Sequence, residues 1–327
     1  GSAQYVHTFD KCFFMPSDLT AGLEYNRDRL KDNMWGYNRH TDQTVNIYSA
    51  FLQNEWKNDR WGILIGGRLD KHNMVDNVIF SPRANLRFNP TQNINLRLSY
   101  SSGFRAPQAF DEDMHIENVG GTVAMIERAK DLKEEKSQSF SVSADMYHRF
   151  GAFQTNLLIE GFYTRLTDVF VLGKPYDRGD GILVKTRSNG PGAKVMGLTL
   201  EGKVAYLSIL QIQAGLTLQR SRYDEPHKWH DDAPAEKKIF RTPDTYGYFT
   251  ATCTPIKPLS IALSGTYTGR MLVQRMDITA ENAELGKMPE RKAEAIRTPR
   301  FFDLGVKLAY DFKLYLSLIH ISEPTRH

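Results

Sequence analysis

Residues 93–100 read Asn-Ile-Asn-Leu-Arg-Leu-Ser-Tyr, a strict alternation of polar and apolar side chains. Successive side chains of a β-strand point to opposite faces, so this segment predicts a strand with one apolar and one polar face. The apolar face consists of Ile94, Leu96, Leu98 and Tyr100. The same alternation returns in the segments 19–26, 139–146, 211–219 and 302–311. The sequence therefore predicts an all-β protein.

Short turns and long polar segments alternate along the chain. Short turns are predicted at 16–18, 58–59, 89–92, 149–151, 207–208 and 255–258. Long segments are predicted over 31–43, 72–77, 106–133, 173–181, 224–240 and 273–296. Loops of that length are uncommon in compact soluble domains. Bacterial outer-membrane barrels have short periplasmic turns at one rim and long extracellular loops at the other. About thirteen antiparallel strands fit this pattern in one β-domain.

Composition excludes several other classes. The chain has 327 residues, and its formal net charge of +4 is too small to indicate nucleic-acid binding. No apolar run approaches the roughly 20 residues that a membrane helix needs. A barrel strand of about 9–11 residues, by contrast, hides its apolar residues at alternate positions. Cys12 and Cys253 lie too far apart for a disulfide scaffold or a zinc ribbon, and no cofactor is predicted.

Aromatic residues cluster beside the predicted short turns, where the interfacial girdle of a membrane barrel lies. They are Phe13, Phe14, Trp56, Trp61, Phe88, Tyr147, Phe153, Tyr206, Tyr310 and Phe312. The alternative interpretation is that aromatic residues favour strands in any sheet.

An ordered set of motifs adds a family resemblance. The segments 50–56 (AFLQNEW), 66–70 (GGRLD), 80–83 (FSPR) and 96–107 (LRLSYSSGFRAP) follow one another, and 132–137 (LKEEKS) comes next. Their order resembles the barrel of TonB-dependent receptors. The last motif is similar to that family's leucine-lysine-proline-glutamate-arginine-serine signature, with Glu134 in the place of the proline. The resemblance covers most of residues 19–313.

The resemblance implies an antiparallel transmembrane β-barrel fragment. In the family an N-terminal plug fills a barrel of about 22 strands, and a short N-terminal box engages TonB, which couples the inner-membrane proton gradient to uptake. Residues 1–315 are then expected to form part of the barrel, without the plug and roughly the first seven strands. Residues 316–327 resemble a translated sequencing adapter and are expected to be a non-native tail. The complete barrel is expected to be monomeric.

Two groups of residues are candidates for function. Arg105 and the acidic segment after it are expected to line a ligand vestibule, although a hydrated extracellular loop is an equal alternative. The members of that segment are Asp111, Glu112, Asp113 and His115. The second group, on the polar face of its strands, is expected to contact the polar surface of the plug. It consists of Arg68, Arg83, Arg87 and Arg97.

Other chemistry finds less support. The segment 227–232 (HKWHDD) has metal-ligand types, but without a fixed spacing a solvated loop is favoured. Ser99 to Ser102 with His115 and Asp111 lack the spacing of a nucleophile elbow, so no enzyme is predicted. Met125, Ala129 and Leu132 have helical spacing and predict a short helix in the longest loop.

The resemblance therefore implies a transporter of a Gram-negative outer membrane, surrounded by lipid and lipopolysaccharide. Its ligand would be an extracellular small molecule, such as a ferric siderophore or a cobalamin-like compound, with oligosaccharide third. No bond would be made or broken. The rival class is a passive porin or adhesion barrel, which would share the strand alternation and the loop asymmetry. An enzymatic barrel comes third.

Overall fold

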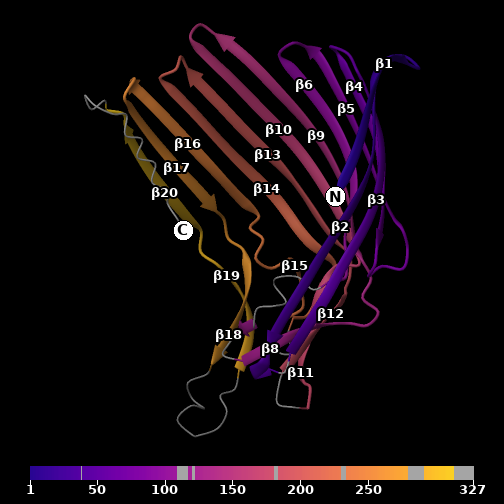
Figure 1. The fold of residues 1–327 in the computed structure, drawn as a ribbon. Helices are drawn as coiled ribbons and strands as arrows, with labels where there is room; N and C mark the ends of the chain where they lie inside the picture. Colours follow the sequence, from indigo (N-terminus) through magenta and orange to yellow (C-terminus); the bar gives the residue numbers. More distant parts are fainter. Residues whose placement is uncertain are drawn as a thin grey trace.

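The computed structural model describes residues 1–37, 39–108, 117–119, 122–179, 183–229, 233–278 and 291–312. Its main feature is one large antiparallel sheet, curved like the wall of a barrel (Figure 1). The predicted non-native tail lies outside the described residues. The strands along the sheet are, in order, β1 (Ser2–Cys12), β2 (Met15–Met34), β3 (Arg39–Lys57), β4 (Trp61–His72), β5 (Ile79–Thr91), β6 (Ile94–Arg105), β9 (Glu135–Phe150), β10 (Phe153–Thr167), β13 (Ala193–Tyr206), β14 (Leu210–His227), β16 (Thr245–Ile256), β17 (Leu259–Thr268) and β20 (Phe301–Tyr310).

This order confirms the prediction of an antiparallel barrel wall of about thirteen strands. Each strand pairs with the strand that precedes it along the path, and β15 (Glu236–Lys238) pairs with β14 outside that path. Within the described residues β1 and β20 are the two edges, and they do not pair with each other. Figure 1 shows them at opposite sides of the open sheet.

Short turns lie at one rim and long connections at the other (Figure 1). The short turns are residues 13–14, 58–60, 92–93, 151–152, 207–209 and 257–258. The turn predicted at 16–18 is wrong, because Phe13 takes the positive φ of the reversal and Ser17 already pairs with Phe9. Pro16 is tolerated because it lies near the beginning of its strand.

The long connections carry more regular structure than the sequence predicted. The segment 31–43 is mostly strand: β2 and β3 extend as a hairpin in which Lys31 pairs with Asp42, and η1 (Trp35–Tyr37) precedes β3. The segment 273–296 contains the hairpin of β18 (Leu272–Ile278) and β19 (Arg291–Arg297). Polar sequence predicts a loop in both places, but exposed hairpins can be polar on both faces.

A small sheet joins two of the long connections. It has the order β11 (Phe170–Asp177), β12 (Leu183–Asn189), β8 (Thr122–Arg128) and β7 (Glu117–Val119). The short helix predicted from Met125, Ala129 and Leu132 is therefore wrong. Met125 pairs with Val184 in the parallel β8–β12 ladder, and both are almost fully buried. A neighbouring strand from the other connection supplies the hydrogen-bond partners, and this tertiary contact overrides the local spacing.

The two faces of the main sheet differ in the way the alternation predicts. Along β14, Leu216 and Leu218 are 41% and 46% exposed, whereas Thr217 between them is 7% exposed. The apolar side chains thus lie on the outward face and the polar ones on the sheltered inward face. This is the reverse of a water-soluble fold and suits a wall surrounded by hydrocarbon.

Aromatic side chains pair next to the short turns, as the girdle prediction requires. The rings of Trp61 and Phe88 stack with centroids 4.3 Å apart. Phe14 stacks on Trp56, and Phe153 lies 4.8 Å from Tyr206. No helix in the described part of the chain is long and apolar enough to cross a membrane.

Candidate functional site

The four arginines predicted to face the lumen all lie on the inward face. Arg97 precedes the outward Leu98, and Arg97 pairs directly with Arg87 on β5. Arg83 lies four residues before Arg87, in the same phase of the strand. Arg68 on β4 pairs with Ser81, which shares that phase. All four arginines therefore share one face of the sheet, and what they contact on that face stays a prediction.

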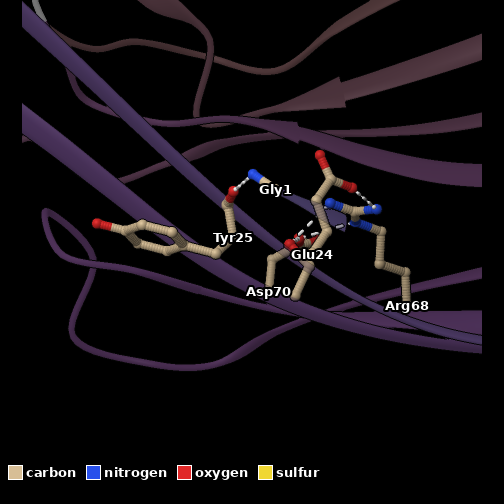
Figure 2. A network of polar contacts seen from close by, with 6 residues as sticks. Gly1, Glu24, Tyr25, Arg68 and Asp70 are labelled. Carbon is tan, nitrogen blue, oxygen red and sulfur yellow. Dashed lines mark hydrogen bonds and ion pairs between the residues drawn. The ribbon is translucent and has the colours of Figure 1, made fainter. Parts of the chain in front are cut away.

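Arg68 is the centre of a polar network that joins three strands (Figure 2). Its Nη1 lies 2.9 Å from Glu24 Oε2 on β2, and its Nε lies 2.8 Å from Asp70 Oδ1. Its Nη2 donates to Ser49 Oγ on β3 at 2.7 Å, and that hydroxyl donates to Asp70 Oδ1 at 2.6 Å. Asp70 and Ser49 are buried. Hydrogen bonds between charged groups are strong when sheltered from water, so this network fixes the wall itself.

Sequence reasoning missed the partners of Arg68. Asp70 could have been predicted, because it lies two residues after Arg68 on the same face of the strand. Glu24 and Ser49 were not, because only the register places Glu24 opposite Ser49 and Ser49 opposite Asp70. Since Arg68 has three polar partners on its own wall, it is less available to another domain than a free inward arginine would be.

The other three arginines line a shallow hollow in the inward face. The hollow has a volume of about 490 Å³, and its wall also includes Glu55, Asn85, Ser99 and Ser101. Arg87 donates to the carbonyl of Asn58 at 3.2 Å, and Arg97 Nε donates to Asn95 Oδ1 at 2.8 Å. The guanidinium of Arg83 has no hydrogen bond or ion pair with any described residue.

The charge of this basic hollow is not balanced within the wall. Arg87 and Arg97 stand directly opposite each other, and like charges at such a pair repel. Glu55 is the one carboxylate among the described residues that line the hollow. Guanidinium groups bind carboxylates in a fixed, often bidentate geometry. The basic hollow is therefore suited to an anionic surface docked against the inward face.

A second polar network braces the inward face further along the sheet. Tyr248 on β16 donates its hydroxyl to Glu201 Oε2 on β13 at 2.7 Å. Gln213 on β14 donates to Glu201 Oε1 at 3.0 Å, and Lys203 Nζ lies 3.1 Å from the same oxygen. The two networks together make the inward wall polar and cross-linked.

At the rim of the long connections, Arg105 ends β6. Its guanidinium lies over the ring of Phe170, 5.5 Å from the centroid. This contact joins the beginning of one long connection to another. The other vestibule candidates, Asp111, Glu112, Asp113 and His115, lie outside the described residues.

The beginning of the longest connection is tied to the sheet. His72, fully buried at the end of β4, lies with its Nε2 3.2 Å from Gln108 Oε1. Arg128 on β8 donates to the carbonyl of Pro107 at 2.6 Å. Residues 106–108 are thus held in place directly before the segment that the vestibule prediction concerns.

The described residues do not support the metal-binding or the catalytic alternative. Among the described residues no group of three or more histidine, cysteine, aspartate or glutamate side chains is arranged for a metal ion. Residues 230–232 of the candidate metal loop lie outside the described part, as do Asp111 and His115. Ser99 accepts a hydrogen bond from Asn85 at 2.7 Å within the wall.

A family model matches almost the whole chain. The family is described as "TonB dependent receptor-like, beta-barrel", and the match covers residues 2–319. No curated protein matches the sequence.

Solved structures with the same fold are named as receptors or transporters. The siderophore receptor PirA from Acinetobacter baumannii superposes with a TM-score of 0.66 at 16% identity, over 95% of this chain and 48% of that one. A mutant of the ferric enterobactin receptor PfeA from Pseudomonas aeruginosa gives 0.66 at 15%, over 95% and 46%. The FrpB iron transporter from Neisseria meningitidis gives 0.61 at 14%, over 95% and 48%. The chain thus spans about half the length of these structures.

Proposed function

This chain belongs to the TonB-dependent receptor family, and from that membership we propose that the full-length protein admits a scarce nutrient through an outer membrane. Members of this family are transport receptors of Gram-negative outer membranes, not enzymes. The observation that carries the proposal is the wall itself: an outward apolar face, an inward polar face, and long connections gathered at one rim. We place that rim outside the cell.

In this proposal the parts have separate roles. The long connections capture the ligand, with Arg105 and residues 111–115 among the lining groups. The inward wall holds a plug in a monomeric barrel, and TonB pulls on that plug from the periplasm. A ferric siderophore is the first cargo to test, because the similar structures are named as siderophore or iron receptors. A cobalamin-like compound is the second.

Uptake by cells tests this function. A strain without the gene, grown without iron, should lose accumulation of at least one labelled ferric siderophore or of labelled cobalamin, and a plasmid copy should restore it. Restoration should also require the gene for TonB and an energised inner membrane. Uptake that persists without TonB would contradict the proposal and favour a passive porin.

The basic hollow provides the proposed contact with the plug. Arg83, Arg87 and Arg97 would bind carboxylates on the plug surface, whereas Arg68 would hold the wall. The motivating observation is an uncompensated cluster of guanidinium groups on a face that a plug would cover. An acidic plug surface would neutralise that cluster.

Replacing Arg97 by glutamine should therefore have opposite effects with and without the plug. In a barrel lacking the plug, the change removes the repulsion with Arg87 and should stabilise by about 0.2–1 kcal/mol. In the full-length protein it should destabilise by about 1 kcal/mol, because an acidic partner on the plug loses its donor. Chemical unfolding in detergent measures both values.

Lys307→Gln is the matched control, since Lys307 also faces inward but lies on β20, far along the sheet from the basic hollow. It should give the same change in both proteins. An equal effect of Arg97→Gln in the two proteins would refute the proposed plug contact.

A further inference from the structure

Two long connections meet at one buried histidine. The first is residues 73–78, between β4 and β5, and the second begins at residues 106–108, directly after β6. Val75 of the first and Ala106 of the second lie in the same small apolar cluster. His72, the last residue of β4, is fully buried and makes a hydrogen bond to each of the two segments. Its ring is therefore a polar link between the two connections.

The hydrogen bonds of His72 decide which ring nitrogen carries the proton. The backbone N–H of Met74 donates to Nδ1 at 3.0 Å. Because a backbone N–H can only donate, Nδ1 carries no proton, and the proton of the neutral ring lies on Nε2. Nε2 lies 3.2 Å from Gln108 Oε1 and donates to that oxygen. Only the neutral imidazole can make both bonds at once.

A second proton on His72 would break this arrangement. A protonated Nδ1 is a donor, so two donors would face each other at the contact with Met74. The ring is 0% exposed, and an enclosed charge is costly unless it is paired. Asp70 is the carboxylate whose charge favours the imidazolium, but it already accepts hydrogen bonds from Arg68 and Ser49. The imidazolium is therefore expected to leave its site, which releases both connections.

Charged residues surround this junction without holding the ring in place. They are Asp70 and Lys71 on β4, Asp76 in the first connection, Arg105 at the end of β6 and Arg128 on β8. Lys71 donates to the carbonyls of Val75 and Asp76, at 3.1 and 2.6 Å. Arg128 donates to the carbonyl of Pro107, and the residue opposite His72 on β3 is apolar. The contacts of Lys71 with the connection also place the junction at the rim, outside the membrane-spanning part of the wall.

The link between the connections is therefore sensitive to acid. Burial lowers the pKa of His72, and the hydrogen bond with Gln108 and the charge of Asp70 oppose this effect. When the junction opens, the ring meets water and its pKa returns to about 6.5. Protons thus bind the open form more tightly than the closed one. The link is held above about pH 6.5 and is lost as the pH falls through the lower pKa of the closed form.

We infer that His72 is an acid-sensitive switch whose protonation releases residues 73–78 and 106–108 together. The second segment leads directly to residues 111–115, which the proposed function assigns to ligand capture. Acid would therefore loosen the capture site and favour release of the ligand outside the cell. This consequence rests on the proposed function, whereas the opening of the junction does not.

Hydrogen exchange of the full-length protein in detergent, at pH 7.5 and at pH 5.5, tests the switch without any ligand. Dividing the observed exchange rate by the intrinsic rate at each pH gives the opening equilibrium. Between the two pH values this equilibrium should rise about three- to tenfold in both segments, the upper value applying if the pKa of the closed form lies below 5.5. Residues 211–219, within β14, should show no such rise.

The variant His72→Asn removes the ring that binds the proton but keeps an oxygen that can accept from the N–H of Met74, as in an Asx turn. It should abolish the pH response of both segments. The matched control is His227→Asn, which replaces a half-buried histidine on β14 whose ring contacts Tyr223. This control should respond to pH as the wild-type protein does.

Three results would overturn the switch. They are an opening equilibrium that is equal at the two pH values in the wild-type protein, a pH response that survives His72→Asn, and a response confined to one of the two segments. A normal exchange response in a protein that takes up neither siderophore nor cobalamin would support the switch and count against the proposed function.

Discussion

Replacing Leu263 by arginine should lower the free energy of unfolding of the membrane-inserted protein by about 2–4 kcal/mol. Leu263 lies in the middle of β17 on the outward face, between Ala251 on β16 and Val306 on β20. Both neighbours are apolar, and Val306 is 72% exposed. Neither of these two residues could pair with a charged side chain at position 263. A guanidinium there would enter hydrocarbon. Unfolding by denaturant in lipid vesicles, with the full-length protein, measures the loss.

The next residue supplies the control. Ser264 points inward between Thr250 and Gly305, and the glycine leaves space beside it. Ser264→Arg should change the free energy of unfolding by no more than about 0.5 kcal/mol. Equal costs at the two positions would mean that the outward face does not meet lipid, and the account of the wall would fail.

Arg68→Leu should destabilise the full-length protein by about 2 kcal/mol. Truncating one partner of a buried ion pair costs about 3–5 kcal/mol, and the partial exposure of the Arg68 side chain, 37%, lowers that figure. The cost arises at Asp70, whose carboxylate is 4% exposed and would keep only the hydroxyl of Ser49 as a partner among the described residues. Denaturant unfolding again gives the value.

The double variant R68L/D70N separates the network from a packing effect. Removing the charge of Asp70 should recover at least half of the loss, because the penalty of a buried, unpaired carboxylate disappears. Additive losses in the double variant would contradict the network. The single variant Glu24→Gln should cost less than about 1 kcal/mol, since that ion pair is more exposed.

The sequence predicted the architecture well because simple local patterns determine a barrel wall. Strand faces alternate with period 2. Leu98 and Arg97 can therefore be assigned to opposite faces without knowing which strands pair with theirs. Turns and loops alternate because each antiparallel strand returns to the opposite rim. The strand count, the antiparallel pairing and the aromatic pairs next to the turns all depend on this alternation, and the structure confirms them.

What the sequence could not predict depends on contacts between distant segments. The parallel pairing of β8 with β12 joins two separate connections, and no local pattern indicates it, so the spacing around Met125 predicts a helix instead. The partners of Arg68 need the register of several strands at once. The polar hairpin over residues 31–43 was missed because its cross-strand pairs, such as Lys31 with Asp42, use the same residue types as loops.

The measurement that tests the central claim most directly is cysteine labelling on intact cells. In a full-length protein without Cys12 and Cys253, Asn77→Cys lies in a long connection and Asp59→Cys lies in a short turn, and both residues are exposed. We predict that a membrane-impermeant maleimide labels Asn77→Cys on intact cells and labels Asp59→Cys only after the outer membrane is permeabilised. Labelling of Asp59→Cys alone on intact cells would place the long connections in the periplasm and contradict the receptor account.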